Sequence, residues 1–329
     1  MLSSLLLPSL LLIIGLALLV WSSDIFIEGA ASTAKHLSIS PLIIGVVVLG
    51  FGTSMPEVVV ATLASLDNSP GLAIGNAVGS NIANIALVLG FTAIIAPIVV
   101  KSSILKRELP VLLAISVGAY LLVLDGHLDI YDGIILVVAL VAVMGWMIKA
   151  NKAIDTSDPL ASETQSELDD LPELTKNKAL IYLVGGLIIL MLSAKMMVAG
   201  AVDIAHFFEV PEVVIGLTII AIGTSLPELA AAISAARKNE ADLMIGNIIG
   251  SNIFNILAVL AVPALLAPSA LDSDVLYIDM PIMLGLTFMM LLMAIPRKGK
   301  AIIHKSEGIL LVSLFIAFLI LLYFRATAV

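Results

Sequence analysis

A polar peptide occurs twice in an otherwise apolar chain, at positions 171 residues apart. Segment 52–57 (GTSMPE) recurs as 223–228 (GTSLPE), and 75–85 (GNAVGSNIANI) recurs as 246–256 (GNIIGSNIFNI). Of the 17 paired positions 13 are identical, and in both copies 27 residues separate the glutamate from the last asparagine. A carboxylate within a hydrophobic span is costly and usually has a function. Two copies of one polar block favour a transporter in which two repeats meet at one site.

The composition excludes a soluble domain. The 329 residues are 60% hydrophobic and 12% charged, with a mean hydropathy of +1.16. The apolar runs are continuous and exceed the roughly 20 residues that a helix needs to cross a bilayer, so they indicate helices rather than barrel strands. We expect an all-α integral membrane protein with ten spans. They are predicted at 5–33, 41–66, 71–97, 104–124, 130–149, 178–206, 211–237, 241–267, 274–295 and 302–324.

A hydrophilic, acidic segment at 150–177 divides the chain into a first half, 1–149, and a second half, 178–329. We interpret this segment as a solvated linker. Each half has five predicted helices, which is an odd number, so equivalent helices run in opposite directions and the repeats are inverted. The second and seventh helices then bring Glu57 and Glu228 together near the middle of the membrane.

The basic residues predict the orientation. Fourteen of the 16 Lys and Arg residues fall on one side of the ten-helix arrangement. That side is expected to be cytoplasmic. The prediction is a multi-pass protein of the plasma (inner) membrane, with 150–177 in the cytoplasm and both termini outside.

The repeated blocks carry ligands for hard cations. Pro56 and Pro227 each remove a helical hydrogen bond just before the glutamate, and the freed carbonyls of a broken helix can bind ions. Thr53 and Ser54 lie four and three residues before Glu57, so their hydroxyls share its face. Oxygen ligands of this kind suit Ca²⁺ and Na⁺ rather than Zn²⁺ or Cu⁺. The alternative is that these polar residues only pack helices together, but two copies with a glutamate each favour a site.

The paired motifs resemble the alpha repeats of the cation/calcium antiporter superfamily. The resemblance is strongest to the sodium/calcium exchanger family and its bacterial YrbG-like branch, at an alpha-1 motif of 50–85 and an alpha-2 motif of 221–256. It implies a secondary active transporter, not an enzyme, that works by alternating access without a cofactor. It also implies that the first and sixth helices slide as a gating pair. The cation ligands that it implies are the carbonyls of Gly50 and Ala221 and the side chains of Thr53, Ser54, Glu57, Ser80, Asn84, Thr224, Ser225, Glu228, Ser251 and Asn255.

One position departs from the family pattern. Relatives often carry Asp where this chain has Asn255. The departure leaves the counter-ion open: Na⁺/Ca²⁺ exchange is the first interpretation, H⁺/Ca²⁺ exchange the second, and K⁺ dependence and the oligomeric state are undetermined. A cation channel could use the same ligands. The expected partners are Ca²⁺, Na⁺ and the lipid bilayer, and nothing in the sequence indicates nucleic acid, a disulfide or a thiolate metal site.

Overall fold

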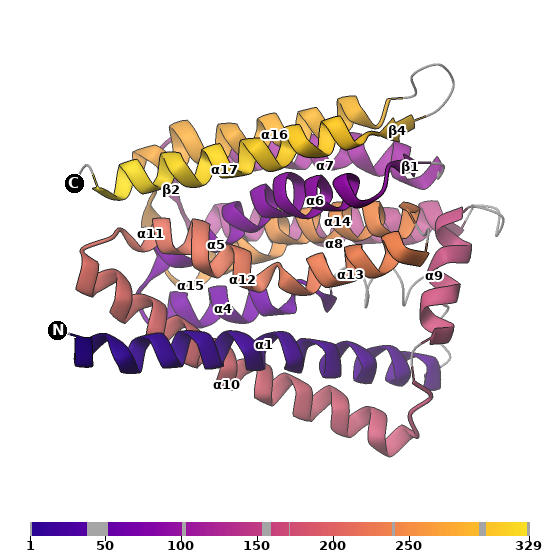
Figure 1. Ribbon diagram of the computed structural model, residues 1–329, viewed down its shortest axis with the longest axis horizontal. Coiled ribbons are helices and arrows are strands. Elements are labelled where there is room, and N and C mark those ends of the chain that lie inside the picture. The colour runs from indigo at the N-terminus through magenta and orange to yellow at the C-terminus, as the bar shows by residue number, and fades with distance from the viewer. Residues whose placement is uncertain are drawn as a thin grey trace.

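The computed structural model describes residues 2–37, 52–100, 103–152, 159–170, 172–238, 241–295 and 301–327. Long helices lie roughly along one common direction, with one short helix, α9, across an end of the molecule (Figure 1). The first half consists of α1 (Leu2–His36), α4 (Met55–Leu66), α5 (Pro70–Ile82), the π-helical turn η2 (Ala83–Leu89), α6 (Gly90–Ile95), β1 (Ile98–Val100), α7 (Ser103–Leu122), β2 (His127–Leu128) and α8 (Ile130–Lys152).

After α9 (Pro159–Asp170), the second half repeats this order. It consists of α10 (Lys176–Phe208), α11 (Glu212–Ile215), η3 (Gly216–Ile220), α12 (Ala221–Thr224), α13 (Leu226–Lys238), α14 (Ala241–Phe254), η4 (Asn255–Val259), α15 (Ala261–Leu266), β3 (Ser269–Ala270), η5 (Val275–Asp279), α16 (Met280–Met293), β4 (Ala301–Ile303) and α17 (Lys305–Thr327).

Eight helical segments of the described chain are long and apolar enough to cross a membrane, two fewer than the ten spans expected. Two shorter or more polar helices occupy the remaining predicted ranges. These are α4, with 12 residues, and α7, with 20. Residues 38–51 lie outside the described residues. They include the first eleven positions of the predicted span 41–66.

The central helices are buried and the outer ones are not. In the most apolar stretches of Pro70–Ile95 and Ala241–Leu266, 78% of the residues are buried, against 22% in the corresponding stretches of α1, α8 and α17. The outer helices expose large apolar side chains such as Ile13, Val141 and Ile316. Apolar exposure of this extent fits contact with lipid rather than water. The repeated polar blocks on α5 and α14 therefore lie in the middle of the protein.

Two short antiparallel strand pairs join the halves, and the sequence did not predict them. β1 pairs with β4, with Ile98 opposite Ile303, and β2 pairs with β3, with His127 opposite Ala270. Each pair takes one strand from the first half and one from the second. Pairing satisfies backbone groups that a chain leaving a helix would otherwise expose.

The two chain termini lie at one end of the molecule, and α9 lies at the other (Figure 1). Because α9 lies within 150–177, part of the predicted linker is helical. At the end with the termini, Arg325 bonds Asp274 and Asp279, each at 2.7 Å. Asp279 is fully buried, so this ion pair fixes the end of α17 against η5.

The longest helices, α1 and α10, pack against each other in an antiparallel arrangement through glycines. A Cβ atom at Gly15 would lie 2.7 Å from the backbone nitrogen of Met197, and one at Gly186 would lie 2.8 Å from that of Phe26. No real Cβ atom tolerates such distances, so the backbones approach closely only because these residues are glycines. Small residues are the usual means by which membrane helices associate.

Candidate cation-binding site

A helix begins within the first repeated block in both halves. α4 begins at Met55 after a turn at Thr53 and Ser54, and α13 begins at Leu226 after Ser225. The φ and ψ angles of the two turn residues are nearly the same, −88° and 6° at Ser54 and −82° and 4° at Ser225. The prolines stand in the first turn of each new helix, where a missing N–H costs nothing. The two helices thus start at equivalent positions, and each has a glutamate in its first turn. In the second half, where α12 precedes α13, the predicted interruption of the helix is described.

The second repeated block changes helical type where its last asparagine stands. α5 passes into the π-helical turn η2, which contains Asn84, and α14 passes into η4, which begins at Asn255. A π turn inserts one extra residue into an α-helix and is common at functional sites. The turn therefore rotates the helix at the residue that both motifs place toward the centre.

Hydrogen bonds join the two motifs across the halves. Ser54 donates to Oε1 of Glu228 at 3.1 Å, and Ser251 donates to the same oxygen at 3.2 Å. Glu57 and Glu228 are also close enough for their charges to repel each other. Both glutamates are fully buried, so their charges need a compensating partner.

Several buried oxygens of the site accept no hydrogen bond from the described residues. They are both carboxylate oxygens of Glu57, Oε2 of Glu228, Oδ1 of Asn84, Oδ1 of Asn255 and Oγ of Ser225. Buried polar atoms without partners are rare because each costs about 1–3 kcal/mol. Carboxylate, amide and hydroxyl oxygens are the ligands that Ca²⁺ and Na⁺ prefer, so this group suits a bound cation.

Every described side chain predicted as a ligand is buried, with at most 7% of its surface exposed. Gly50 lies outside the described residues. The carbonyl of Ala221 accepts a hydrogen bond from the backbone N–H of Ser225 at 3.1 Å, and the hydroxyl oxygen of Thr224 lies 3.4 Å from it. The ten side chains and this carbonyl come from α4, α5, η2, α12, α13, α14, η4 and the turns before α4 and α13.

The predicted ligands include no histidine, and the sequence contains no cysteine. Throughout the ranges that the structure describes, no three or more His, Cys, Asp or Glu side chains gather as they would around a metal ion. The site therefore has two carboxylates and otherwise neutral oxygens, with a formal charge of −2. That charge balances one Ca²⁺ or two Na⁺.

Three asparagines of the motifs contact the site although the sequence did not predict them as part of it. Asn76 and Asn247 bond Thr224 and Thr53, respectively, and Asn252 accepts a hydrogen bond from Asn84 at 3.1 Å. The bond from Asn84 Nδ2 leaves its Oδ1 for other partners. The signal that could have found Asn76 and Asn247 is their spacing, because each lies four residues before Ser80 or Ser251 on the same helix face.

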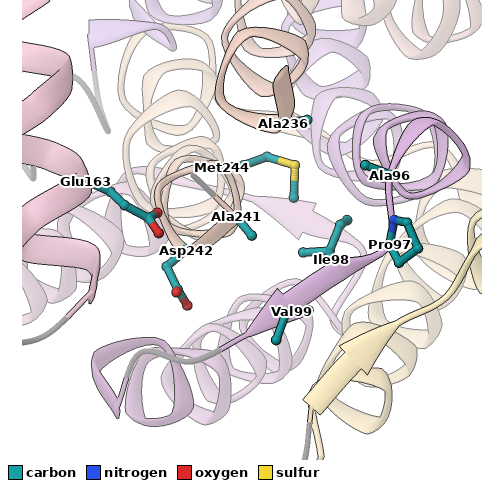
Figure 2. A pocket seen from close by; sticks show the side chains of 9 residues that line it. All are labelled: Ala96, Pro97, Ile98, Val99, Glu163, Ala236, Ala241, Asp242 and Met244. Atoms are coloured by element: carbon teal, nitrogen blue, oxygen red, sulfur yellow. The ribbon is translucent and has the colours of Figure 1, made fainter. Parts of the chain in front are cut away.

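A separate pocket lies away from these motifs, between α9 and the start of α14 (Figure 2). Glu163 of α9 and Asp242 of α14 border it, together with apolar residues that include Ile98 and Met244. Glu163 Oε2 accepts the backbone N–H of Leu243 at 2.7 Å. A carboxylate at the start of a helix is stabilised by the helix dipole, so this contact docks the linker helix onto α14.

The chain matches a known protein family over most of its length. The profile of the family described as sodium/calcium exchanger protein matches residues 7–149 and 178–324, which is most of the chain. The chain belongs to the sodium/calcium exchanger family. Members of this family are transporters and not enzymes, so the chain is a cation/Ca²⁺ antiporter by family and a multi-pass membrane protein by its helices.

The exchanger relatives match nearly end to end. CaxA of Alkalimonas amylolytica is 43% identical over 97% of this chain and 99% of its own length. The inner membrane protein YrbG of Escherichia coli (strain K12) is 41% identical, with 97% of each chain covered. Structures of the sodium-calcium exchanger NCX_Mj, soaked with Na⁺ and Sr²⁺, superpose with a TM-score of 0.65 at 33% identity, covering 95% of this chain and 98% of that one. The membership in the YrbG-like branch expected from the motifs is confirmed.

Proposed function

We propose that this protein exchanges Ca²⁺ for Na⁺ across the plasma (inner) membrane, by alternating access at one site between the two repeated motifs. The observation that carries the proposal is the group of buried oxygens around Glu57 and Glu228 that accept no hydrogen bond. Two carboxylates with neutral oxygens can hold one Ca²⁺ or two Na⁺ in turn. Use of one site by both ions in turn is the basis of exchange.

We also propose that the chain has ten spans in two inverted repeats, 1–149 and 178–329, separated by the linker at 150–177. Contacts between α1 and α10 support this arrangement. Gly15 faces Met197, and Gly186 faces Phe26. Because the repeats are offset by 171 residues, Gly15 corresponds to Gly186 and Phe26 to Met197, so the two contacts are equivalent. Contacts that recur when the halves are exchanged are what a two-fold axis produces. The antiparallel arrangement of these two helices favours an axis in the membrane plane.

The strand pairs support the same axis. β1 follows α6 as β3 follows α15, and β2 precedes α8 as β4 precedes α17. Exchanging the halves therefore turns the β1–β4 pair into the β3–β2 pair. In the proposed orientation, α9 is cytoplasmic and both termini are outside, since the sequence predicts 14 of the 16 Lys and Arg residues on the side of the linker.

The proposed access change is a sliding of α1 and α10 past the other helices. The family resemblance implies this motion, and the packing supports it. Both helices are largely exposed to the surroundings and contact each other through glycine backbones. A pair that is bound mainly to itself can move as one unit.

Sodium is the proposed counter-ion. MaX1 of Methanosarcina acetivorans, 29% identical over 96% of this chain, is named a sodium/calcium exchanger. The test is uptake of ⁴⁵Ca²⁺ into proteoliposomes that contain the purified protein and are loaded with Na⁺, K⁺, choline or acid. We expect uptake only with an outward Na⁺ gradient. Uptake driven by a pH gradient without Na⁺ would establish H⁺/Ca²⁺ exchange instead, and uptake without any counter-ion would indicate a channel.

The second candidate, H⁺/Ca²⁺ exchange, rests on Asn255. An aspartate at this position could add a third negative charge, whereas the asparagine is neutral. The formal charge of the site therefore balances two Na⁺ rather than three. Protons on Glu57 and Glu228 could then replace Na⁺ as the neutralising partner. The acid-loaded vesicles distinguish this case.

A further inference from the structure

The hydroxyl groups of Thr53 and Thr224 are each held by the opposite half of the protein. Thr224, in the second half, donates to Oδ1 of Asn76 at 3.1 Å and lies 3.4 Å from the hydroxyl of Ser80. Thr53, in the first half, donates to Oδ1 of Asn247 at 3.3 Å and lies 3.3 Å from the hydroxyl of Ser251. An asparagine and a serine one turn apart on α5 or α14 thus bind a threonine of the other half.

The direction of these hydrogen bonds determines what the threonine oxygens can do. A hydroxyl has one proton and two acceptor lone pairs, and an amide oxygen can only accept. The threonine must therefore be the donor in its bond to asparagine. Once its proton points toward the asparagine, the threonine oxygen can only accept. In Thr224 one lone pair can accept the hydroxyl proton of Ser80, and the other is available to a cation.

Asn76 is fixed in the orientation that this requires. Its Nδ2 donates to the backbone carbonyl of Glu57 at 3.1 Å, so its Oδ1 is the atom that faces Thr224. Asn76 is fully buried, and this pair of bonds also links the chain at Glu57 to Thr224 in the other half. Both bonds are directed, because a rotated amide would present N–H groups to the threonine and the carbonyl oxygen to another carbonyl.

A competing acceptor shows what the asparagine prevents. The hydroxyl of Thr224 also lies 3.4 Å from the carbonyl oxygen of Ala221 in its own helix, and threonines commonly bond such carbonyls. That carbonyl is itself one of the ligands implied by the family. Without Asn76, the hydroxyl of Thr224 would donate to the carbonyl oxygen of Ala221. That bond would occupy a lone pair of the carbonyl oxygen and would turn the lone pairs of the threonine oxygen in another direction.

We propose that Asn76 and Asn247 are positioning residues that take the hydroxyl protons of Thr224 and Thr53 and so aim both threonine oxygens at the transported cation. This role rests on the proposed function. Neither asparagine is itself a ligand of the ion. Because each acts on the other half, cation affinity depends on the two halves being correctly seated against each other.

The test is a pair of double-mutant cycles on Ca²⁺ binding by the purified protein, measured by calorimetry, and on the KM for ⁴⁵Ca²⁺ exchange. The first cycle combines Asn76→Ala with Thr224→Val, and the second combines Asn247→Ala with Thr53→Val. We expect each asparagine variant to weaken Ca²⁺ binding and raise KM about tenfold, with the maximal rate changed less than about twofold. In the valine backgrounds the same asparagine changes should have no further effect, since the hydroxyl on which they act is gone.

Thr92→Val is the control for loss of a buried hydroxyl, because Thr92 bonds only the carbonyl of Val88 in its own helix. We expect its Ca²⁺ affinity to match that of the parent, and its combination with Asn76→Ala to be additive. The second cycle guards against misfolding in the first, since Asn247 Nδ2 bonds no described residue and its removal breaks only the bond from Thr53. Additive losses within either cycle, or unchanged affinity with a lower melting temperature in the absence of cation, would overturn the positioning role. Absence of saturable Ca²⁺ binding by the parent protein would instead overturn the proposed function.

Discussion

Glu57 and Glu228 have equivalent local environments, because each lies in the first turn of a helix, α4 or α13. The unbonded N–H groups at a helix start carry partial positive charge and favour a nearby carboxylate. This stabilisation, about 0.3–1 kcal/mol, is small beside the cost of burying a charge. A bound cation would supply the remainder, which would couple the binding energy to the charge of the site.

Removal of either carboxylate should therefore abolish exchange. Glu57→Gln or Glu228→Gln leaves one negative charge for a divalent ion while keeping the side-chain volume, so the protein should fold. We expect ⁴⁵Ca²⁺ exchange to fall at least about 100-fold and calorimetric Ca²⁺ binding to be lost, in keeping with the several kcal/mol that a buried charge partner contributes. Glu173→Gln, an exposed carboxylate of the linker, is the control. Near-normal exchange in either site variant would contradict the pairing of these glutamates.

At the scale of helices, the contact between α1 and α10 depends on glycines rather than on large side chains. Gly186 touches the backbone of α1 at Phe26, whereas its neighbour Gly185 has no atom within 4 Å of where a Cβ would stand. Two adjacent glycines on one helix thus differ only in what they face.

This difference predicts opposite outcomes for the same substitution. Gly186→Ala should force α1 and α10 apart and destabilise the protein by about 1–3 kcal/mol, as overpacking usually does. Gly185→Ala should stay within about 0.5 kcal/mol of the parent. Thermal unfolding in detergent measures both, and transport rates in proteoliposomes show whether a looser pair also changes exchange. Equal melting temperatures for the two variants would mean that this glycine contact is not a packing constraint.

At the scale of the whole molecule, the position of α9 relative to the termini makes the orientation testable. The chain has no cysteine, so a single one can be introduced at Ser166, which is exposed on α9. Because the sequence predicts 14 of the 16 Lys and Arg residues on the side of the linker, Ser166→Cys should resist an impermeant maleimide in intact cells and react after lysis. A cysteine at Thr327, near the other end, should show the reverse. Ready labelling of position 166 from outside would invert the proposed orientation.

Charge balance over the whole cycle predicts an electrical signature. An aspartate at position 255 that was protonated would be as neutral as the asparagine present here. Formal charge balances two Na⁺, but hydroxyl and carbonyl dipoles can stabilise a third, so we expect three Na⁺ per Ca²⁺. Exchange would then move one net charge per cycle, worth about 2.3 kcal/mol per 100 mV. An imposed potential should therefore change the initial rate of Na⁺-driven ⁴⁵Ca²⁺ uptake. A rate that ignores the potential would indicate two Na⁺ per Ca²⁺.

The sequence alone determined the membrane class, the family and the chemical character of the site. The membrane class follows from the composition and from the length of the apolar runs. The family and the oxygen ligands expected at the site follow from the repeated motif and its glutamates, because a motif is defined by residue type and by spacing along the chain. The breaks before Glu57 and Glu228 could also be predicted, since proline acts through its own backbone. The helical segments Pro70–Ile95 and Ala241–Leu266 and the helices α8 and α10 follow their predicted spans closely, because the length of an apolar run is visible in the sequence.

Only the tertiary structure decided which residues of one half touch which residues of the other. The bond from Ser54 to Glu228, the strand pairs and the role of Asn76 all join residues more than 100 positions apart or in different helices, and helical periodicity says nothing about such partners. The π turns at Asn84 and Asn255 are likewise invisible in the sequence, where they look like continuous α-helix. The helix within the linker and its contact with α14 through Glu163 were likewise not predicted, because the contact joins residues 80 positions apart. Composition and motif thus specify what the site is made of, and packing between the two halves specifies how each of its oxygens is aimed.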